Sequence, residues 1–384
     1  MSKPLRAAVI GTGFIGRVHV RSARLAGAEV VGVAASSPER SAEAAQSLGV
    51  ARAYASGIEA ARDADVDVIH ICTPNSLHME VAKAALESGK HVVCEKPLAT
   101  SLQDARLLTD LARSKGLVGT VPFINRYHPM TREARSRVQS DETGKLYLIQ
   151  GSYLQDWLMQ AGDTNWRVDV GAGGKSRAFA DIGSHLCDLI EWISGERFTS
   201  LIATLGTPVA QRSAAASRVA FQASGEVKET KAVDTEDVAC LILRTGRGTL
   251  ASLTVSQVSA GRKNRLWFEL DGARQSIMFD LESPEQLWIG RREGTTMLMR
   301  DPSQFSAEQQ RLAWLPAGHA QGWGDCFEAF VRDSYAAIRG EAHAGLPTFA
   351  DGARSMSIVE AVLRSSASNE WTAINDQDND QERS

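Results

Sequence analysis

The sequence predicts an α/β chain of two domains, the first a doubly wound parallel sheet and the second an α+β domain with a large, mostly antiparallel open sheet. Its 384 residues fit two domains of roughly 100–200 residues each. Over the first third, short runs rich in Val and Ile alternate with Ala- and Leu-rich helical patterns, which is typical of βαβ units. Beyond residue 122 strand patterns follow one another with few helices between them, which indicates antiparallel pairing.

The first domain, residues 1–122, contains five expected strands and four expected helices. The strands are Arg6–Ile10, Val30–Ala34, Val66–Cys72, His91–Cys94 and Val118–Val121. The helices are Ile15–Ala26, Pro38–Leu48, Leu77–Ser88 and Leu102–Lys115. Because right-handed crossovers join parallel strands, these elements predict helices on both faces of one sheet.

The second domain, residues 123–366, contains a run of expected strands that Gly-containing turns separate. The strands are Tyr147–Gln155, Ser200–Thr207, Val238–Leu243, Thr249–Gln257, Leu266–Leu270 and Gln275–Phe279. Gly turn signals at 244–248 and 270–274 favour hairpins. Two helical patterns, Trp323–Arg339 and Ala350–Ser366, close the domain, and the polar tail 367–384 is expected to fray towards its end at Asn375–Ser384.

Composition narrows the class of protein. The chain carries 42 basic and 46 acidic residues, a net charge of −4, with 43% hydrophobic and 23% charged residues. This balance gives no electrostatic footprint for nucleic acid, and no apolar run reaches the roughly 18–20 residues that span a bilayer. The five cysteines form no CxxC pair, and the N-terminus has no signal-peptide pattern. We therefore expect a cytoplasmic enzyme.

A glycine fingerprint follows the first strand. The segment Gly11-Thr-Gly-Phe-Ile-Gly16 matches G-x-G-x-x-G and opens the first helix near Phe14. Gly11 permits a tight turn, Gly13 lets the backbone approach a pyrophosphate, and Gly16 allows close packing of helix and strand. The helix N-terminus then offers unpaired N–H groups to phosphates. In this strand–turn–helix context the motif predicts a Rossmann dinucleotide-binding domain.

The sequence leaves the choice between NAD and NADP open. An NAD site usually places Asp or Glu at the end of the second strand. Here that position is followed by Ser36, Ser37 and Arg40, and no acid stands at the strand end. These three side chains could hold a 2′-phosphate; equally, the serines could only cap the next helix while Arg40 stays solvated.

Four further motifs stand in a characteristic order. They are Thr73-Pro-Asn-Ser-Leu-His78, Cys94-Glu-Lys-Pro-Leu-Ala99, Gly171-Ala-Gly-Gly174 and Asp181-Ile-Gly-Ser-His-Leu-Cys-Asp188. With the glycine fingerprint, they make the chain resemble the glucose–fructose oxidoreductase/inositol dehydrogenase (Gfo/Idh/MocA) family from about residue 5 to residue 366. The Glu-Lys-Pro and Asp-x-Gly-x-His motifs carry more of this resemblance than the glycines do.

Lys96 is the first candidate catalytic residue. It follows a strand that ends at the carboxyl edge of the parallel sheet, where ligands bind in such folds. A lysine there can hydrogen-bond a reacting hydroxyl and stabilise negative charge on its oxygen. The resemblance implies this role beside the nicotinamide ring, and it also implies a cis Lys96–Pro97 bond; without the motif an ordinary surface lysine would be the better interpretation.

Asp181 and His185 are the other two candidate catalytic residues. Four positions apart, they share a face if the segment Ile182–Ile193 is helical, with Asp181 as its N-cap. His185 has a pKa range suited to accepting a hydroxyl proton, and Asp181 would orient it. A capped helix with a core histidine is the alternative for the pair alone; the resemblance implies that the pair lies beside Lys96. Asp188 is expected to be structural or supporting. No third ligand or HExxH motif accompanies the pair, so we expect no metal site.

The motifs and the resemblance together give the following sets. The expected cofactor site comprises Gly11, Thr12, Gly13, Phe14, Ile15, Gly16, Ser36, Ser37, Arg40, Thr73, Pro74, Asn75, His78, Glu95, Lys96, Pro97, Asn125, Trp166 and Arg167. The expected substrate site comprises Lys96, Tyr127, Trp157, Arg167, Asp181, His185, Arg262, Lys263 and His319. Trp157 could stack on a sugar or be packed in the core. His319 could reach the pocket or lie in a loop without a role, and the cations at 262–265 could bind an anionic substituent or only solvate a hairpin end.

The resemblance implies an NAD(P)-dependent oxidoreductase that moves hydride between nicotinamide and a secondary hydroxyl or ketone of a sugar, glycoside or cyclitol. It also implies a homodimer or homotetramer formed through the open sheet. Two alternatives remain. Some relatives use a retained NAD to oxidise C3 transiently and cleave a glycoside, and others are nucleotide sensors without catalysis. Intact Lys96, Asp181 and His185 argue against a sensor.

Overall fold

Six parallel strands near the N-terminus form the first sheet of the computed structural model, which describes residues 3–214, 229–341 and 343–375. Two groups of residues pack mainly among themselves. The described residues of the first unit fall within Met1–Ile124, Gly171–Gly174 and Gly324–Met356. Those of the second unit fall within Asn125–Val170, Lys175–Trp323 and Ser357–Ser384. Each unit has its own sheet, as the predicted fold class requires.

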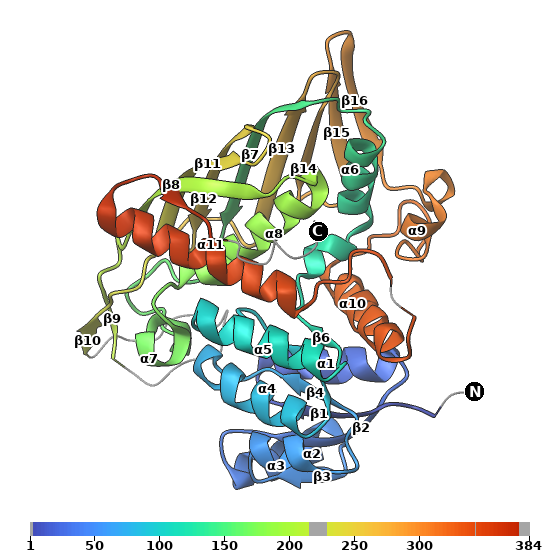
Figure 1. Cartoon of the computed structure of the whole chain (residues 1–384), viewed down its shortest axis with the longest axis vertical. Coiled ribbons are helices and arrows are strands. Elements are labelled where there is room, and N and C mark those ends of the chain that lie inside the picture. Colours follow the sequence, from blue (N-terminus) through green and yellow to red (C-terminus); the bar gives the residue numbers. More distant parts are fainter. Residues whose placement is uncertain (1–2, 215–228, 342, 376–384) are drawn as a thin grey trace. The chain divides into compact units, whose positions relative to one another are not determined.

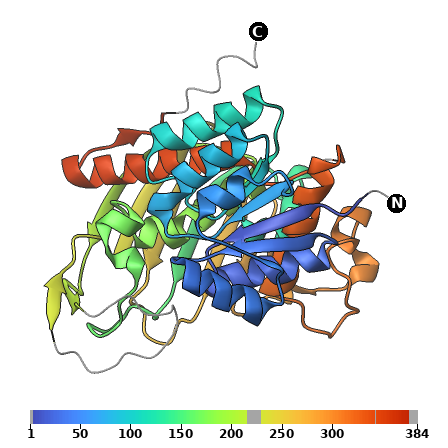
Figure 2. The same ribbon diagram turned by 90° about the horizontal axis from the view of Figure 1, so that it is seen from below.

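The first unit is a doubly wound sheet with strand order β3-β2-β1-β4-β5-β6, in which every pairing is parallel. Its elements are β1 (Arg6–Ile10), α1 (Phe14–Leu25), β2 (Glu29–Ala34), α2 (Pro38–Leu48), β3 (Arg52–Tyr54), α3 (Gly57–Arg62), β4 (Val68–Ile71), η1 (Asn75–Leu77), α4 (His78–Glu87), β5 (His91–Cys94), α5 (Leu102–Ser114), β6 (Gly119–Thr120) and most of α10 (Trp323–Ile338). Figure 2 shows helices on both faces of this sheet. The predicted doubly wound fold is confirmed.

Local sequence explains why these elements begin and end where they do. Ser37 caps α2 by accepting a hydrogen bond from the backbone of Arg40, and Pro38 occupies the first turn, where its missing N–H costs nothing. The strand β4 is buried along its whole length, as a strand covered on both faces must be. The elements β3 and α3 were not predicted, because three and six residues are too few to show a periodicity.

The second unit contains a nine-stranded sheet with order β16-β15-β14-β13-β7-β12-β11-β8-β17. Its strands are β7 (Leu146–Leu154), β8 (Phe198–Gly206), β11 (Val238–Thr245), β12 (Leu250–Ser256), β13 (Arg265–Gly272), β14 (Ser276–Asp280), β15 (Gln286–Arg291), β16 (Gly294–Met299) and β17 (Thr372–Ala373). Only β7 and β12 pair in parallel among these strands. A separate ribbon pairs β9 (Gln211–Ser213) with β10 (Thr230–Ala232). The mostly antiparallel open sheet was predicted, whereas β9, β10 and β15–β17 were not.

Helices cover one face of this sheet (Figure 1). They are α6 (Pro129–Gln139), η4 (Phe179–Gly183), α8 (Ser184–Ser194) and the later part of α11 (Phe349–Ser368). The second unit also contains most of η2 (Ile124–Tyr127), η3 (Trp166–Val168), η5 (Pro302–Gln304) and α9 (Ala307–Gln310), while the short α7 (Val170–Gly173) lies mainly in the first unit. A Cβ at Gly151 would lie 3.0–3.2 Å from Leu253, Ile190 and Leu186, so this glycine lets α8 approach β7 closely.

One predicted helix is different in the structure. The segment expected as a helix over Ile182–Ile193 begins with the π-helical turn η4, and α8 starts only at Ser184. Asp181 therefore lies inside the π-helical turn, and Gly183 is the residue that precedes α8, so the prediction of Asp181 as an N-cap is wrong. The predicted fraying of Asn375–Ser384 concerns residues 376–384, which lie outside the described residues. Throughout the described part of the chain, no helix combines the length and hydropathy needed to cross a bilayer.

Candidate functional site

The glycine fingerprint forms a tight turn between β1 and α1. Gly11 has a φ of +93°, and a Cβ there would lie 2.3 Å from the carbonyl oxygen of Cys72. A Cβ on Gly16 would lie 1.9 Å from the carbonyl oxygen of Gly11, so α1 could not pack against the turn with a larger residue. Around Gly13 the space is open to 4 Å. The turn therefore leaves room for a pyrophosphate at the N-terminus of α1, whose first turn carries no acidic residue.

The turn after β2 carries the three residues expected to face a ribose. Arg40 donates from one guanidinium nitrogen to Ser36 Oγ at 3.1 Å, and Ser37 caps α2. Glu39 stands beside them, and its hydrogen bond from Ser37 lowers the pKa of that carboxyl. The structure thus confirms a helix cap at Ser37, and it also keeps Arg40 and Ser36 together at an exposed turn.

Lys96 lies directly after β5, in a loop that neighbouring loops of the first unit hold in place. The Lys96–Pro97 bond is cis. The ring of His78 is fully buried, with Nδ1 2.7 Å from the carbonyl oxygen of Pro97 and Nε2 3.0 Å from that of Thr73. Asn75 donates from Nδ2 to the carbonyl oxygen of Gly173 at 2.8 Å. The loops after β4 and β5 thus meet at the carboxyl edge of the sheet, where ligands bind in open α/β folds.

Asp181 and His185 lie in the second unit, on either side of the start of α8. Gln257 donates from Nε2 to Asp181 Oδ2 at 2.8 Å, and Arg167 Nε lies 3.3 Å from Asp181 Oδ1. The ring of His185 lies 6.4 Å from that of Tyr153, centroid to centroid. Burial and the charge of Asp181 raise the pKa of Tyr153 above its usual value, so this phenol stays protonated at neutral pH.

Buried acids hold the segment that leads into the π-helical turn. Glu236 accepts hydrogen bonds from Ser176 Oγ at 2.7 Å and from the backbone N–H groups of Arg177 and Phe179 at 2.9 Å. Asp237, fully buried, forms ion pairs with Arg177 and with Arg212, and the latter pair is 2.6 Å long. Neither this network nor the roles of Gln257 and Tyr153 were predicted from the sequence. The only signal for it was the polar run Thr235-Glu-Asp237 directly before a strand.

Two tryptophans predicted for the site have defined contacts. Trp157 donates from Nε1 to Gln155 Oε1 at 2.8 Å and packs partly against the buried residues Leu158, Val168 and Val233. Gln155 and Tyr153 both donate to Asn264 Oδ1 at 2.9 Å, which connects Trp157 to the neighbour of His185. The guanidinium of Arg167 lies 4.4 Å from the centre of the Trp166 ring.

Other predicted residues are engaged with the protein itself. Arg126 forms a buried ion pair with Asp188, in keeping with the expected supporting role of that acid. Tyr127 is 1% exposed and lies under the guanidinium of Arg132, and Asn125 is also buried. Within the same unit, the cations at the hairpin end are balanced by carboxylates, with Lys263 2.6 Å from Asp156 and Arg262 2.6 Å from Glu282. His319 is exposed, with Nδ1 3.3 Å from the carbonyl oxygen of Ala317.

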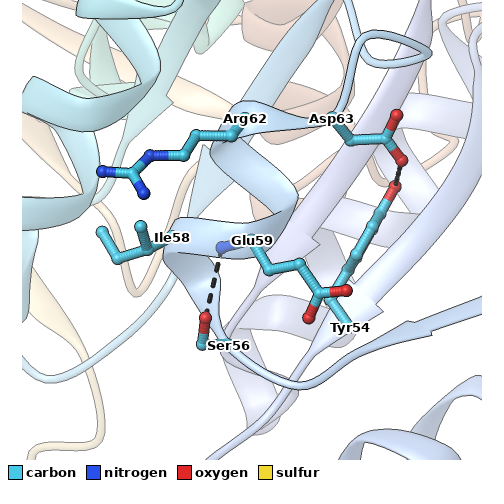
Figure 3. Close-up of a pocket in the computed structure, with 6 residues that line it drawn as sticks. All are labelled: Tyr54, Ser56, Ile58, Glu59, Arg62 and Asp63. Atoms are coloured by element: carbon cyan, nitrogen blue, oxygen red, sulfur yellow. Dashed lines mark hydrogen bonds between the residues drawn. The ribbon is translucent and has the colours of Figure 1, made fainter.

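A surface hollow of about 530 Å³ lies beside β3 and α3 (Figure 3). It is lined by Tyr54, Ser56, Ile58, Glu59, Arg62 and Asp63. Its polar groups bind one another: Tyr54 Oη donates to Asp63 at 2.6 Å, and Ser56 accepts from the backbone of Glu59. None of the predicted site residues lines it.

In the described ranges, no three His, Cys, Asp or Glu side chains are grouped so that they could hold a metal ion.

Comparisons with known proteins agree with the fold of the two units. Residues 5–123 match the oxidoreductase family with an NAD-binding Rossmann fold, and residues 131–278 match the GFO/IDH/MocA C-terminal domain. Levoglucosan dehydrogenase of Pseudarthrobacter phenanthrenivorans is 29% identical over 96% of this chain and 98% of its own length. Glucose-6-phosphate 3-dehydrogenase of Bacillus subtilis is 23% identical over 92% of this chain and 93% of its own. Among solved structures, levoglucosan dehydrogenase in complex with NADH and L-sorbose superposes with a TM-score of 0.88 at 27% identity, covering 97% of this chain and 100% of that one. The chain therefore belongs to the Gfo/Idh/MocA family of NAD-binding oxidoreductases.

Proposed function

We propose that this protein is a dehydrogenase that oxidises a secondary hydroxyl of a sugar, glycoside or cyclitol, or reduces the corresponding ketone. Two observations support the proposal. Lys96 lies in a loop at the carboxyl edge of the first sheet, and a hydrogen bond between His78 and the carbonyl oxygen of Pro97 fixes this loop. Asp181 is held by a hydrogen bond from Gln257 and by the guanidinium of Arg167. The family relatives named as dehydrogenases of levoglucosan, glucose 6-phosphate and scyllo-inositol support this substrate class.

The three side chains have different tasks in this proposal. Lys96 donates a hydrogen bond to the reacting oxygen and stabilises the negative charge that develops on it. His185 accepts the hydroxyl proton during oxidation and returns it during reduction. Asp181 orients the imidazole and contacts a neighbouring hydroxyl. The open turn at Gly13 would hold the pyrophosphate of NAD(P), which when bound would accept hydride during oxidation and donate it during reduction.

A substrate panel tests the proposal. Levoglucosan, glucose 6-phosphate, scyllo-inositol and neutral glycosides are incubated with NAD and NADP in parallel, and absorbance of the reduced nicotinamide is followed. We expect at least one sugar to be oxidised by the wild type, and a loss of more than about 100-fold in kcat for Lys96→Ala and His185→Ala. Equal rates in wild type and both variants would refute the assigned roles. Release of an aglycone without accumulation of reduced cofactor would establish the redox-neutral glycosidase instead.

We also propose that the protein assembles into a dimer or tetramer through the outer face of the nine-stranded sheet, with a second copy of the chain as the partner. Several apolar side chains on this face are exposed: Tyr147, Leu148, Ile242, Leu250, Met297 and Met299. Leu148 and Leu250 are direct neighbours across β7 and β12, and an exposed apolar surface of this kind is typical of an interface.

A cytoplasmic location is part of the proposal, because none of the five cysteines, all of them in the described ranges, forms a disulfide.

A further inference from the structure

A buried chain of four polar side chains runs through the first unit and ends beside Lys96. Tyr335 of α10 lies with Oη 2.7 Å from Nε2 of His70, in the middle of β4. His70 Nδ1 lies 2.8 Å from Nδ1 of His19, in α1. His19 Nε2 lies 3.1 Å from Oε1 of Glu95, the residue that precedes Lys96. Four elements that are distant in sequence therefore contribute one side chain each.

The carboxylate at one end determines which atom donates at every link. A carboxylate can only accept, so His19 Nε2 carries the proton towards Glu95. If His19 carries only this proton, its Nδ1 accepts from Nδ1–H of His70. His70 in turn accepts at Nε2 from the hydroxyl of Tyr335. With Glu95 ionised and one proton on each ring, a single arrangement of protons satisfies all three hydrogen bonds, and each of them is directed towards Glu95.

The burial of these side chains shows whether they conduct protons to solvent or only hold Glu95 in place. His19, His70 and Tyr335 are each 0% exposed. Burial, together with His19, holds the pKa of His70 well below its usual value, and burial raises the pKa of Tyr335. His70 is therefore neutral at pH 7, and this row of side chains ends at a phenol that keeps its proton and has no exposed surface. The hydrogen-bonded side chains therefore form no proton pathway to solvent at Tyr335, and we infer that they hold Glu95 in place.

Glu95 connects His19 to the backbone of Lys96 through its two carboxylate oxygens. One carboxylate oxygen accepts from His19, and the other, Oε2, accepts from the backbone N–H of Lys96 at 3.2 Å. The ring of His19 is itself wedged against Phe327, with centroids 4.8 Å apart, so it has little freedom to follow a movement of the loop. His19 also belongs to α1, the helix that follows the glycine turn.

We propose that His19 is a positioning residue for Lys96: through Glu95 it fixes the backbone from which the lysine reaches the reacting oxygen. The role of Lys96 in this inference rests on the proposed function, whereas the direction of the hydrogen bonds does not. Two experiments separate these parts, one on the imidazole protons and one on catalysis.

The first experiment measures the tautomers by NMR of protein labelled with ¹⁵N at the histidine rings, with the variants His19→Gln and His70→Asn used to assign the two signals. At pH 9 we expect His19 as the Nε2–H tautomer and His70 as the Nδ1–H tautomer, and we expect the His70 signal to stay unchanged down to pH 6. In Glu95→Gln the amide oxygen accepts from the backbone N–H of Lys96, as Oε2 does in the wild type, so the NH2 group faces Nε2 of His19 and both rings are expected to exchange tautomers. Opposite tautomers in the wild type, or rings that ignore Glu95→Gln, would overturn the proposed chain whether or not a substrate is known.

The second experiment compares kcat with the binding of NADH, measured by fluorescence, using a sugar that the wild type oxidises. His19→Leu removes the donor to Glu95 and is expected to lower kcat by about 10- to 100-fold, since small misplacements of a catalytic group have effects of this size. The dissociation constant for NADH is expected to stay within about twofold. His19→Gln keeps a donor near the position of Nε2. The decrease in log kcat relative to the wild type is therefore expected to be smaller than in His19→Leu by at least about a third.

His91→Asn is the matched control, because His91 lies at the opposite end of β5 and its Nδ1 accepts from the backbone of Val118 at 3.0 Å, which Asn can also do. Its kcat is expected to equal that of the wild type. Folded His19→Leu protein with wild-type kcat would refute the positioning role. Equal losses in His19→Leu and His19→Gln, with wild-type thermal stability, would refute it as well. If the wild type oxidises no sugar in the panel, the proposed function fails while the tautomer result still stands.

Discussion

Gln257 donates a hydrogen bond from Nε2 to Oδ2 of Asp181 at 2.8 Å, across 76 residues of sequence. Gln257 is 0% exposed and directly follows β12, whereas Asp181 lies in the π-helical turn before α8. Arg167 approaches the other carboxylate oxygen at 3.3 Å. Both oxygens of Asp181 are thus oriented by side chains that come from the sheet and from the loop after β7.

Loss of this hydrogen bond is expected to impair catalysis more than folding. Gln257→Leu keeps the volume but removes the donor, and we expect kcat/KM to fall by about 10- to 100-fold, the equivalent of one hydrogen bond to a charged group. Gln257→Glu places a second carboxylate against Asp181 and is expected to lose more. The measurement is steady-state oxidation of a sugar from the panel. Gln46→Leu, at an exposed position on α2, is the control; a drop of the same size in Gln46→Leu would contradict the explanation.

The buried ion pairs of Asp237 are expected to matter for stability. Asp237→Asn removes the negative charge between Arg177 and Arg212, all three of which are fully buried, and leaves two cations without their counterion. Breaking a buried pair in this way costs about 3–5 kcal/mol of unfolding free energy. Urea denaturation followed by circular dichroism measures the change. Glu282→Gln breaks the exposed pair with Arg262 and is expected to cost less than about 1 kcal/mol, so similar losses in both variants would contradict the assignment.

Contiguous motifs were the part of the site that the sequence could predict. The bounds expected for β1 and β5 agree with the structure, because both are apolar runs that end at a sharp change in polarity. The turn at 11–16 and the loop at 94–99 could be placed because each follows its strand directly. The folded chain then positions both at the edge of one parallel sheet, as βαβ geometry requires.

The supporting contacts could not be predicted, because they join residues that no local pattern connects. Gln257, Glu236 and Asp237 are ordinary polar residues at the ends of strands, and only the register of the sheet brings them to the segment before α8. The π-helical turn at Asp181 inserts an extra residue per turn, which a helical periodicity of 3.6 does not reveal. The buried chain from Tyr335 to Glu95 needs α10 from the far end of the sequence.

The pH dependence of stability is expected to include a contribution from His91. Burial lowers the pKa of His91 in the folded protein, while the unfolded chain keeps a value near 6.5. Below about pH 7 the unfolded state therefore binds more protons than the folded state, so the free energy of unfolding falls as the pH falls, by at most about 1.4 kcal/mol per pH unit. His91→Asn lacks this proton uptake. Urea denaturation at pH 7.5 and 5.5 should show a smaller loss for the variant than for the wild type, and parallel losses would contradict the prediction.

Charges on the outer face of the nine-stranded sheet are expected to weaken assembly. Ile242 and Leu250 are 51% and 45% exposed on neighbouring strands, and burying a glutamate at either position in an interface is unfavourable. Light scattering after gel filtration should show Ile242→Glu/Leu250→Glu at a lower mass than the wild type. Leu25→Glu, with 48% exposure on α1, is the control and should keep the wild-type mass. A wild type that is already monomeric at micromolar concentration would refute the proposed interface.

A carboxylate introduced after β2 is expected to weaken the binding of NADPH but not that of NADH. No acid stands at the end of this strand, and Arg40 is hydrogen-bonded to Ser36 in the exposed turn, where a 2′-phosphate could be accepted. Ala35→Asp places a negative charge there, which repels the 2′-phosphate but can accept from the 2′-hydroxyl of NAD. We expect the dissociation constant of NADPH to rise by at least about tenfold, because an uncompensated repulsion of about 1.4 kcal/mol suffices for that factor. The constant for NADH should stay equal or fall. Ala35→Asn, of the same shape without the charge, is the control, and titration by fluorescence measures all four values. Equal changes for both cofactors in Ala35→Asp would show that the ribose does not lie at this turn.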